Sequence, residues 1–224
     1  MTEGETIQVD PGPLELKLLA RLPQGRWLVQ PNQAGPPSHV LQQAGQVPLP
    51  PYIRKGVART EDKERYQTVF AQTVGAAAAP TAGLHFTPRT FEDLQKRGIF
   101  WTFVTLHVGP GTFQPMQSDD PAQHRMHQEW GELSPESAWL INERKAAGGR
   151  IVAVGTTSVR VLETARREGT LQPWSGETDL FIYPPYPFRV VDVLLTNFHF
   201  PRTTLLLLAG AFAGTGLLER AYRH

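Results

Sequence analysis

Polar side chains follow three separate apolar runs of this sequence, at the points where those runs end. Such clusters could bind or transform a ligand, because ligands of α/β proteins bind beside the carboxyl ends of the strands. If each run is a strand, the clusters converge without any further assumption. We therefore expect one concave site at the strand ends. The clusters are His107 to Phe113, Gly155 to Ser158 and Thr196 to His199.

The turn from Gly155 to Ser158 is typical of an anion site. It offers three hydroxyl groups in a row, and the free N–H groups of the helix that follows can bind the same anion. Ordinary helix capping requires only one such hydroxyl. Arg160 follows one turn later and either adds positive charge to the site or forms a solvated pair with Glu163.

Histidines suited to proton transfer occur in two of these clusters and in the connection between them. Residues 108–133 show little secondary-structure pattern, and connections longer than roughly 12–15 residues are usually functional or disordered. This connection contains His124-Arg-Met-His127-Gln-Glu129, which is not a disordered composition. Histidine serves as a proton carrier, as a hydrogen-bond donor to phosphate or as a metal ligand.

A metal-dependent hydrolase on a barrel-like fold is an alternative interpretation. The His-x-x-His spacing of His124 and His127 could hold an ion if His107, His199 and Asp179 joined it. That spacing alone is not specific. Metal analysis of protein purified without added metal tests this interpretation, because stoichiometric Zn, Mn or Fe would favour it.

The elements that position these clusters are predicted by alternating helix and strand patterns from about residue 61. Thr87 and Pro88 open one helix, and Gly98 ends it. Such alternation favours a parallel sheet covered by helices. We predict an α/β fold with an open, barrel-like, mostly parallel sheet over residues 48–224. The predicted helices are 87–97, 134–148, 158–168 and 203–213, and the predicted strands are 99–106, 150–154 and 190–195.

The sequence pattern of residues 1–47 predicts a partial β lobe at the N-terminus. This lobe is separate from the α/β catalytic-type domain of residues 48–224. Clusters of Pro and Gly surround two strand-like runs, 14–20 and 26–30. Two or three short strands cannot bury a core alone.

Composition excludes several classes of protein. The 22 basic and 21 acidic residues nearly cancel, so the total charge of +1 does not identify a nucleic-acid binder, although a local patch could still steer RNA. The absence of cysteine excludes a thiol nucleophile and a disulfide framework. The first residues lack the pattern of a signal peptide, and the apolar run 205–213 is shorter than the roughly 20 residues that span a bilayer. We expect a cytoplasmic protein.

Whole strings of this sequence resemble one enzyme family, the S-adenosylmethionine:tRNA ribosyltransferase-isomerases of queuosine biosynthesis. The similarity in order and spacing covers most of residues 48–213, and shared fold alone does not produce it. The strings are Pro48-Leu-Pro-Pro-Tyr-Ile53, Glu64-Arg-Tyr-Gln-Thr-Val69, Ala79-Pro-Thr-Ala-Gly-Leu-His-Phe86, Leu106-His-Val-Gly-Pro-Gly-Thr-Phe113, His124-Arg-Met-His127, Val152-Ala-Val-Gly-Thr-Thr-Ser-Val-Arg160, Thr178-Asp-Leu-Phe-Ile-Tyr-Pro184 and Leu194-Leu-Thr-Asn-Phe-His199.

The resemblance implies a reaction in which S-adenosylmethionine is the ribosyl-donor substrate and no metal is expected. The acceptor would be a 7-aminomethyl-7-deazaguanine base at the wobble position of a tRNA anticodon, and the products would be epoxyqueuosine, adenine and methionine. A proton must leave the carbon beside the sulfonium, which requires a base that is neutral near pH 7, and histidine suits that role. For this reaction we expect His107, His127 and His199 to transfer the protons. An unpaired anticodon base can enter a pocket without melting a duplex.

The other candidate residues are expected to bind the substrates. The Gly155 turn and Arg160 would hold the methionine carboxylate or a phosphate. Gly109 either allows close backbone approach to a ligand or forms a tight turn. For His85, a purely structural role is the alternative to substrate binding. The substrate-binding candidates are Thr81, Gly83, His85, Gly109, Gly111, Thr112, Gly155, Thr156, Thr157, Ser158, Arg160, Asp179 and Asn197.

The resemblance also predicts that both ends are shortened. Members of the family are longer, so we expect a complementary segment or chain to supply further parts of the fold. Pro185 stands where the family usually has glycine. A non-catalytic tRNA-binding remnant is therefore a third interpretation, and the release of adenine from S-adenosylmethionine distinguishes it.

Overall fold

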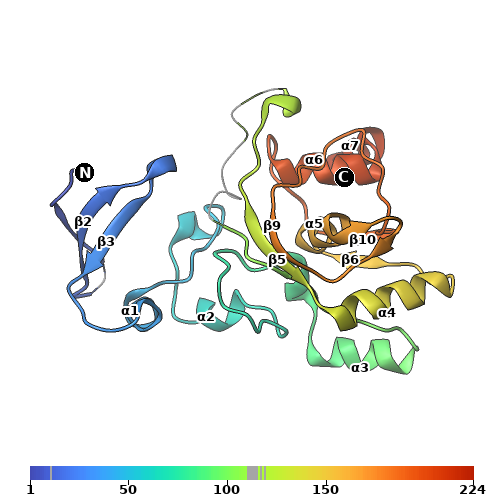
Figure 1. Ribbon diagram of the computed structural model, residues 1–224, viewed down its shortest axis with the longest axis horizontal. Helices are drawn as coiled ribbons and strands as arrows, with labels where there is room; N and C mark the ends of the chain where they lie inside the picture. Colours follow the sequence, from blue (N-terminus) through green and yellow to red (C-terminus); the bar gives the residue numbers. More distant parts are fainter. Residues whose placement is uncertain (11, 110–115, 117, 119) are drawn as a thin grey trace. The chain divides into compact units, whose positions relative to one another are not determined.

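The computed structural model describes residues 1–10, 12–109, 116, 118 and 120–224. The chain divides into two compact units, Met1–Val47 and Pro48–His224 (Figure 1).

The first unit is a three-stranded antiparallel sheet with one helix. Strands β1 (Thr6–Gln8), β2 (Glu15–Arg21) and β3 (Trp27–Pro31) pair in the order β1-β2-β3, and α1 (Pro37–Ala44) follows. The two strands expected here are β2 and β3. Among the described residues of this unit, few apolar side chains are buried: Leu14, Leu18 and Val40.

The second unit alternates short strands with helices. Its helices are α2 (Asp62–Arg65), α3 (Pro88–Lys96), α4 (Pro135–Ala146), α5 (Thr156–Ala165), α6 (Thr204–Ala213) and α7 (Thr215–Arg223). Its strands are β4 (Thr105–Leu106), β5 (Glu129–Leu133), β6 (Val152–Val154), β7 (Arg166–Arg167), β8 (Thr170–Leu171), β9 (Trp174–Thr178) and β10 (Val193–Leu195).

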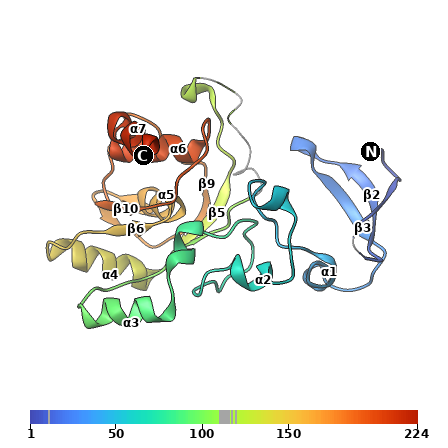
Figure 2. The same ribbon diagram turned by 180° about the vertical axis from the view of Figure 1, so that it is seen from behind.

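Side-chain caps start three of the predicted helices and confirm them. Thr87, Ser134 and Thr203 each accept a hydrogen bond from a backbone N–H of the first turn, at α3, α4 and α6 respectively. Such a bond satisfies one of the donors that a helix start leaves unpaired. Helices α3 and α4 lie side by side in both views (Figures 1 and 2), and the Thr102 and Ser137 hydroxyls are hydrogen-bonded at 2.6 Å between their segments.

The expectation of a mostly parallel sheet is wrong for the strands that the structure describes. Only β6 and β10 pair in parallel, whereas β4-β5-β9 and β7-β8 are antiparallel. The described strands form small separate sheets and no closed barrel, so the fold is mixed α/β.

The antiparallel pairs include four described strands that the sequence pattern did not predict, β5, β7, β8 and β9. Gly131 of β5 lies opposite Gly176 of β9. A Cβ on Gly131 would lie 2.9 Å from the ring of Trp174 and 3.0 Å from the Thr105 carbonyl oxygen. Close packing therefore requires glycine here, and a glycine in a strand interior weakens the β signal of the sequence.

The predicted strand 99–106 is paired only at Thr105–Leu106 in the described chain. Ile99, Phe100 and Phe103 before it are exposed.

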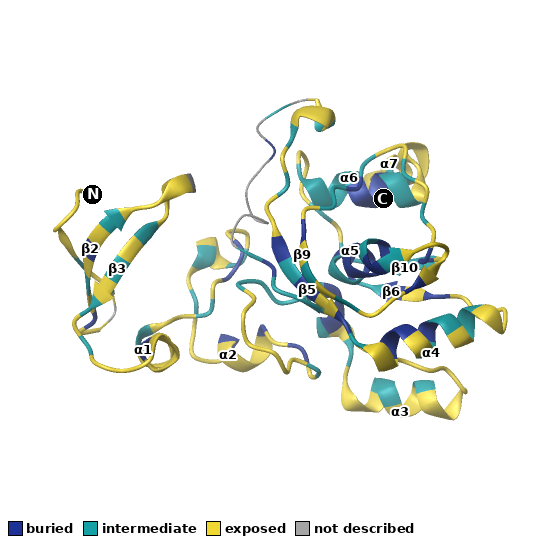
Figure 3. Cartoon of the chain, in the orientation of Figure 1, coloured by how far each residue is buried: buried dark blue, intermediate teal, exposed yellow. Residues whose placement is uncertain are grey.

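Helix α5 lies at the centre of the core. Its Val159 and Val161 are completely buried, and Leu162 and Ala165 are nearly so (Figure 3). They pack with Leu133, Ile182 and Leu208 in one apolar cluster. Helix α6 is buried mainly at residues 208–210.

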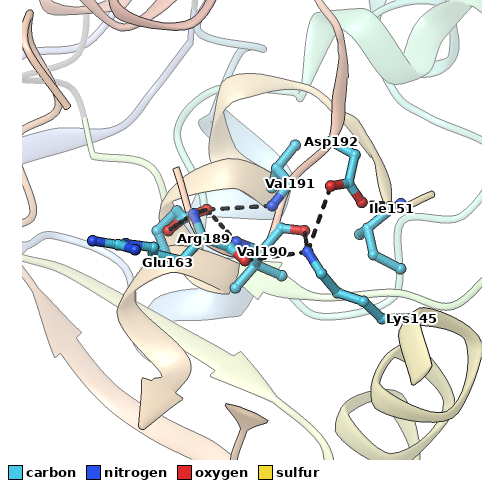
Figure 4. Close-up of polar contacts among 7 residues, drawn as sticks. All are labelled: Lys145, Ile151, Glu163, Arg189, Val190, Val191 and Asp192. Carbon is cyan, nitrogen blue, oxygen red and sulfur yellow. Dashed lines mark hydrogen bonds and ion pairs between the residues drawn. The ribbon is translucent and has the colours of Figure 1, made fainter. Parts of the chain in front are cut away.

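Polar contacts hold the segment that leads into β10 (Figure 4). The Glu163 carboxylate accepts hydrogen bonds from the N–H groups of residues 189, 190 and 191, at 3.0–3.3 Å. Lys145 donates to the carbonyl oxygens of residues 189 and 190, and Asp192 accepts from the Ile151 N–H at 2.8 Å. These contacts place β10 beside β6. Glu163 is therefore a buried anchor, and the suggested solvated pair with Arg160 does not form.

Within the described residues, no single helix is long and apolar enough to cross a membrane. The pair α6 and α7 meets the length and composition requirement together, but it is bent by 112° at its break.

Candidate functional site

Two of the three polar clusters begin at the same edge of one parallel strand pair. Val154 of β6 lies opposite Leu195 of β10. The Gly155 N–H extends this pairing with a hydrogen bond of 2.9 Å to the Leu195 carbonyl oxygen. The turn before α5 and the loop after β10 therefore start side by side.

The Gly155 turn leaves backbone donors without a side-chain cap. Gly155 has φ +89°, a conformation that favours glycine. No side chain caps α5, so the first N–H groups of the helix can bind an anion. Thr156 is buried, and the Ser158 hydroxyl donates to the Val154 carbonyl oxygen at 2.8 Å. Thr157 is half-buried, and of the three hydroxyls it is the one best placed for a ligand.

The 3₁₀-helical turn Thr81–His85 approaches the same place. The Ala82 methyl lies 4.0 Å from the position that a Cβ on Gly155 would take. Thr81 is half-buried and Gly83 is buried, whereas the His85 side chain is exposed. A Cβ on Gly83 would lie 2.5 Å from the Phe70 ring, so this glycine serves close packing.

His199 is held in the loop after β10 by two neighbours. Its Nε2 is hydrogen-bonded to the Thr196 hydroxyl at 2.9 Å. The Tyr222 hydroxyl accepts from the His199 N–H at 2.6 Å and lies 3.0 Å from the His199 carbonyl oxygen, to which it donates. Burial lowers the pKa of His199 below its usual value. The imidazole is therefore neutral near pH 7 and can accept a proton.

His107 follows β4 and is enclosed by its neighbours. Its N–H donates to the Trp130 carbonyl oxygen at 2.7 Å, and the two rings are 4.9 Å apart. A Cβ on Gly75 would lie 2.5 Å from the His107 ring, so only glycine fits there. The buried Nε2 of His107 has no hydrogen-bond partner in the described part of the chain. Such a group is uncommon and is a candidate for contact with a ligand.

A buried ion pair that sequence reasoning missed connects the strand end at Gly109 with α5. Glu129 accepts from the Gly109 N–H at 3.1 Å and pairs with Arg160. Arg160 also donates to the carbonyl oxygens of Leu180 at 3.1 Å and Thr178 at 3.4 Å. Since these contacts occupy both sides of the guanidinium, they favour a positioning role for Arg160 over the direct substrate contact that we predicted.

The remaining candidates are dispersed. His127 and Asp179 are exposed, Asn197 is half-buried, and the structure shows no hydrogen bond or ion pair of their side chains with described residues. His124 packs its ring on Phe181 at 5.2 Å. Gly111 and Thr112 lie outside the described residues. In the described ranges no three His, Asp or Glu side chains gather as metal ligands, so the geometry does not favour the hydrolase interpretation.

Comparisons with known proteins agree on one family. The family model "Queuosine biosynthesis protein" matches residues 1–224. The S-adenosylmethionine:tRNA ribosyltransferase-isomerase of Symbiobacterium thermophilum is 49% identical over 222 residues, which are 99% of this chain and 64% of that protein. The enzyme of the same name from Coxiella burnetii is 53% identical over 184 residues, 82% of this chain and 53% of its own length.

A solved structure supports the same assignment. The S-adenosylmethionine tRNA ribosyltransferase of Thermotoga maritima superimposes with a TM-score of 0.52 at 33% identity. The match covers 94% of this chain and 56% of that protein. This chain thus spans less than two thirds of the length of these relatives.

Proposed function

Because this chain belongs to the queuosine biosynthesis protein family, we propose that it carries the ribosyl-transfer site of an S-adenosylmethionine:tRNA ribosyltransferase-isomerase. The donor is S-adenosylmethionine, and the acceptor is the aminomethyl group of 7-aminomethyl-7-deazaguanine at the tRNA wobble position. Transfer and isomerisation of the ribosyl group give epoxyqueuosine, adenine and methionine. The enzyme acts in the cytoplasm, and a complementary segment or chain completes its fold.

One observation carries this proposal: the Gly155 turn and the His199 loop start from the same edge of the β6–β10 pair. The turn offers N–H donors for the methionine carboxylate. The loop offers a neutral imidazole for the proton that leaves the carbon beside the sulfonium. An anion site and a base next to one another are what this reaction requires.

His107 and His127 are the further candidates for proton transfer. The enclosed His107 has a buried nitrogen that finds no hydrogen-bond partner among the described residues, which suits contact with the departing adenine. His127 is exposed and would act only once a substrate covers it.

Free adenine is the measurement that tests this proposal. The chain is incubated with S-adenosylmethionine and tRNA that carries the deazaguanine base, and the same tRNA without the aminomethyl group is the control. We expect adenine release only with the aminomethylated base. If tRNA binds and no adenine appears, even after addition of the remaining part of a full-length relative, the chain is a non-catalytic binding unit.

A further inference from the structure

Four aromatic side chains gather around the loop after β10, although they come from three distant segments. The rings of Tyr52 and Phe200 are 5.4 Å apart, and those of Phe198 and Tyr222 are 4.9 Å apart. Phe198 is 74% exposed, Tyr52 59%, Phe200 58% and Tyr222 39%. We call these four residues the aromatic rim.

The aromatic rim is not a piece of core. The rim consists of two ring pairs, and Phe198 of one pair lies two positions from Phe200 of the other in the chain. Large aromatic side chains that gather at one place and stay exposed indicate a binding surface. Its position is also informative, because Phe198 and Phe200 flank His199 in the sequence. Whatever covers the rim lies beside the proposed proton acceptor.

Basic side chains accompany the rim on both sides. Arg54 and Lys55 follow Tyr52 in a turn whose residues have φ values of +46° and +55°. Asp62 holds this turn, since it pairs with Arg54 and accepts the Arg59 N–H at 2.6 Å. The Arg54 hydrogen bond lowers the pKa of Asp62, so this carboxylate stays charged.

Lys55 is exposed, and among the described residues it has no ion pair. On the other side of the rim, α7 carries Arg220 and Arg223 next to Tyr222. Glu219 lies 3.9 Å from Arg223, and Arg220 has no ion pair with a described residue. With Arg54 and Lys55, these side chains outnumber the carboxylates Asp62 and Glu219, so the surroundings of the rim are net basic.

Exposed ring faces next to cations match the chemistry of single-stranded RNA. Unpaired bases stack on aromatic side chains, and the phosphates contact Lys and Arg. A duplex cannot use such a surface, because its bases already stack on each other. We propose that the aromatic rim stacks with unpaired bases that flank the nucleotide presented to His199, while Lys55 and Arg220 contact the phosphates. This proposal rests on the proposed function and adds the surface by which RNA is bound.

Fluorescence anisotropy with a labelled tRNA anticodon stem-loop, in the absence of S-adenosylmethionine, tests the proposal. Stacking on one aromatic ring contributes about 1–3 kcal/mol per base, so Tyr52→Ala and Phe200→Ala should each weaken binding roughly 5- to 150-fold. Tyr52→Phe keeps the ring and should bind as the unsubstituted chain does. Trp139→Ala removes an equally exposed aromatic side chain outside the rim and is the matched control.

Several outcomes overturn the proposal. Unchanged affinity of the Tyr52→Ala and Phe200→Ala variants, or no RNA binding at all, removes the rim from recognition. An equal loss on a duplex made from the same stem shows that stacking is not involved. If Tyr52→Ala instead dissociates an oligomer in sedimentation, the rim is an interface between protein chains. Circular dichroism melting confirms that each variant is folded.

The two proposals fail separately. Loop RNA bound through the rim without any adenine release leaves the rim in place and removes the enzymatic function. If adenine release does not respond to the rim substitutions, the enzymatic function stands and the rim has no part in RNA binding.

Discussion

Glu129 and Arg160 form an ion pair that is buried on both sides and joins β5 to α5. Through its second carboxylate oxygen, Glu129 also holds the Gly109 N–H. Arg160 lies one helical turn after Thr156, so this pair connects the strand end at His107 to the start of α5. Two parts of the proposed site are thereby fixed relative to each other.

Loss of one partner of this pair should destabilise the chain strongly. Arg160→Met leaves the Glu129 charge buried without a partner, which typically costs about 3–5 kcal/mol in the free energy of unfolding. Urea unfolding measures this value. The double variant Arg160→Met with Glu129→Leu should lose less free energy of unfolding than the two single variants lose in sum. Removal of the exposed Arg223–Glu219 pair is the control, expected within about 0.5 kcal/mol. Additive single effects would show that the pair is not coupled.

The burial of His199 predicts a pH dependence of stability. Its folded-state pKa is lowered from 6.5, so between that lowered pKa and about 6.5 the unfolded chain binds more protons than the folded chain. The contribution of His199 to stability is thus present above about pH 6.5 and is lost as the pH falls through this window. Urea unfolding of the parent chain and of His199→Asn, compared between pH 7.5 and 5.5, should show a smaller loss in the variant. Equal losses would contradict the burial of this imidazole.

Substitution of His127 distinguishes a catalytic role of this side chain from a structural one. Its side chain is exposed and has no bond to other described residues, so His127→Ala should change the melting temperature very little. If the side chain transfers a proton, the rate of adenine release should fall about 10²–10⁴-fold. The rate is best measured in a full-length relative or in a complemented chain. An unimpaired rate would remove His127 from the mechanism.

Glu163 should matter for stability through the backbone that it holds. Glu163→Ala leaves the buried N–H groups of residues 190 and 191 without their acceptor. We therefore expect the free energy of unfolding in urea to fall by about 1–3 kcal/mol. Glu163→Gln keeps an acceptor oxygen and should recover part of this loss. Glu177→Gln, an exposed change on β9, is the control and should be near neutral. If Glu163→Ala is as stable as that control, the segment before β10 is held by other contacts.

The helices and the family membership could be predicted from the sequence, because both depend on local patterns. The caps at Thr87, Ser134 and Thr203 act within one helical turn, so the residues that start a helix are neighbours in the chain. The strings that carry the family resemblance are also continuous stretches. The polar clusters after β6 and β10 could be predicted as neighbours, because a parallel pair brings both carboxyl ends to one edge.

Only the tertiary structure decided the pairing of strands and of charges. Gly131 and Gly176 face each other across β5 and β9, and a glycine inside a strand weakens its β signal. Close packing against the Trp174 ring requires glycine at position 131, and no local pattern shows this requirement. Likewise, nothing local distinguishes Arg160 as a buried group, since its partner Glu129 lies 31 positions away in the chain. Strand partners and buried ion pairs depend on which segments meet in space, and short-range sequence patterns do not contain that information.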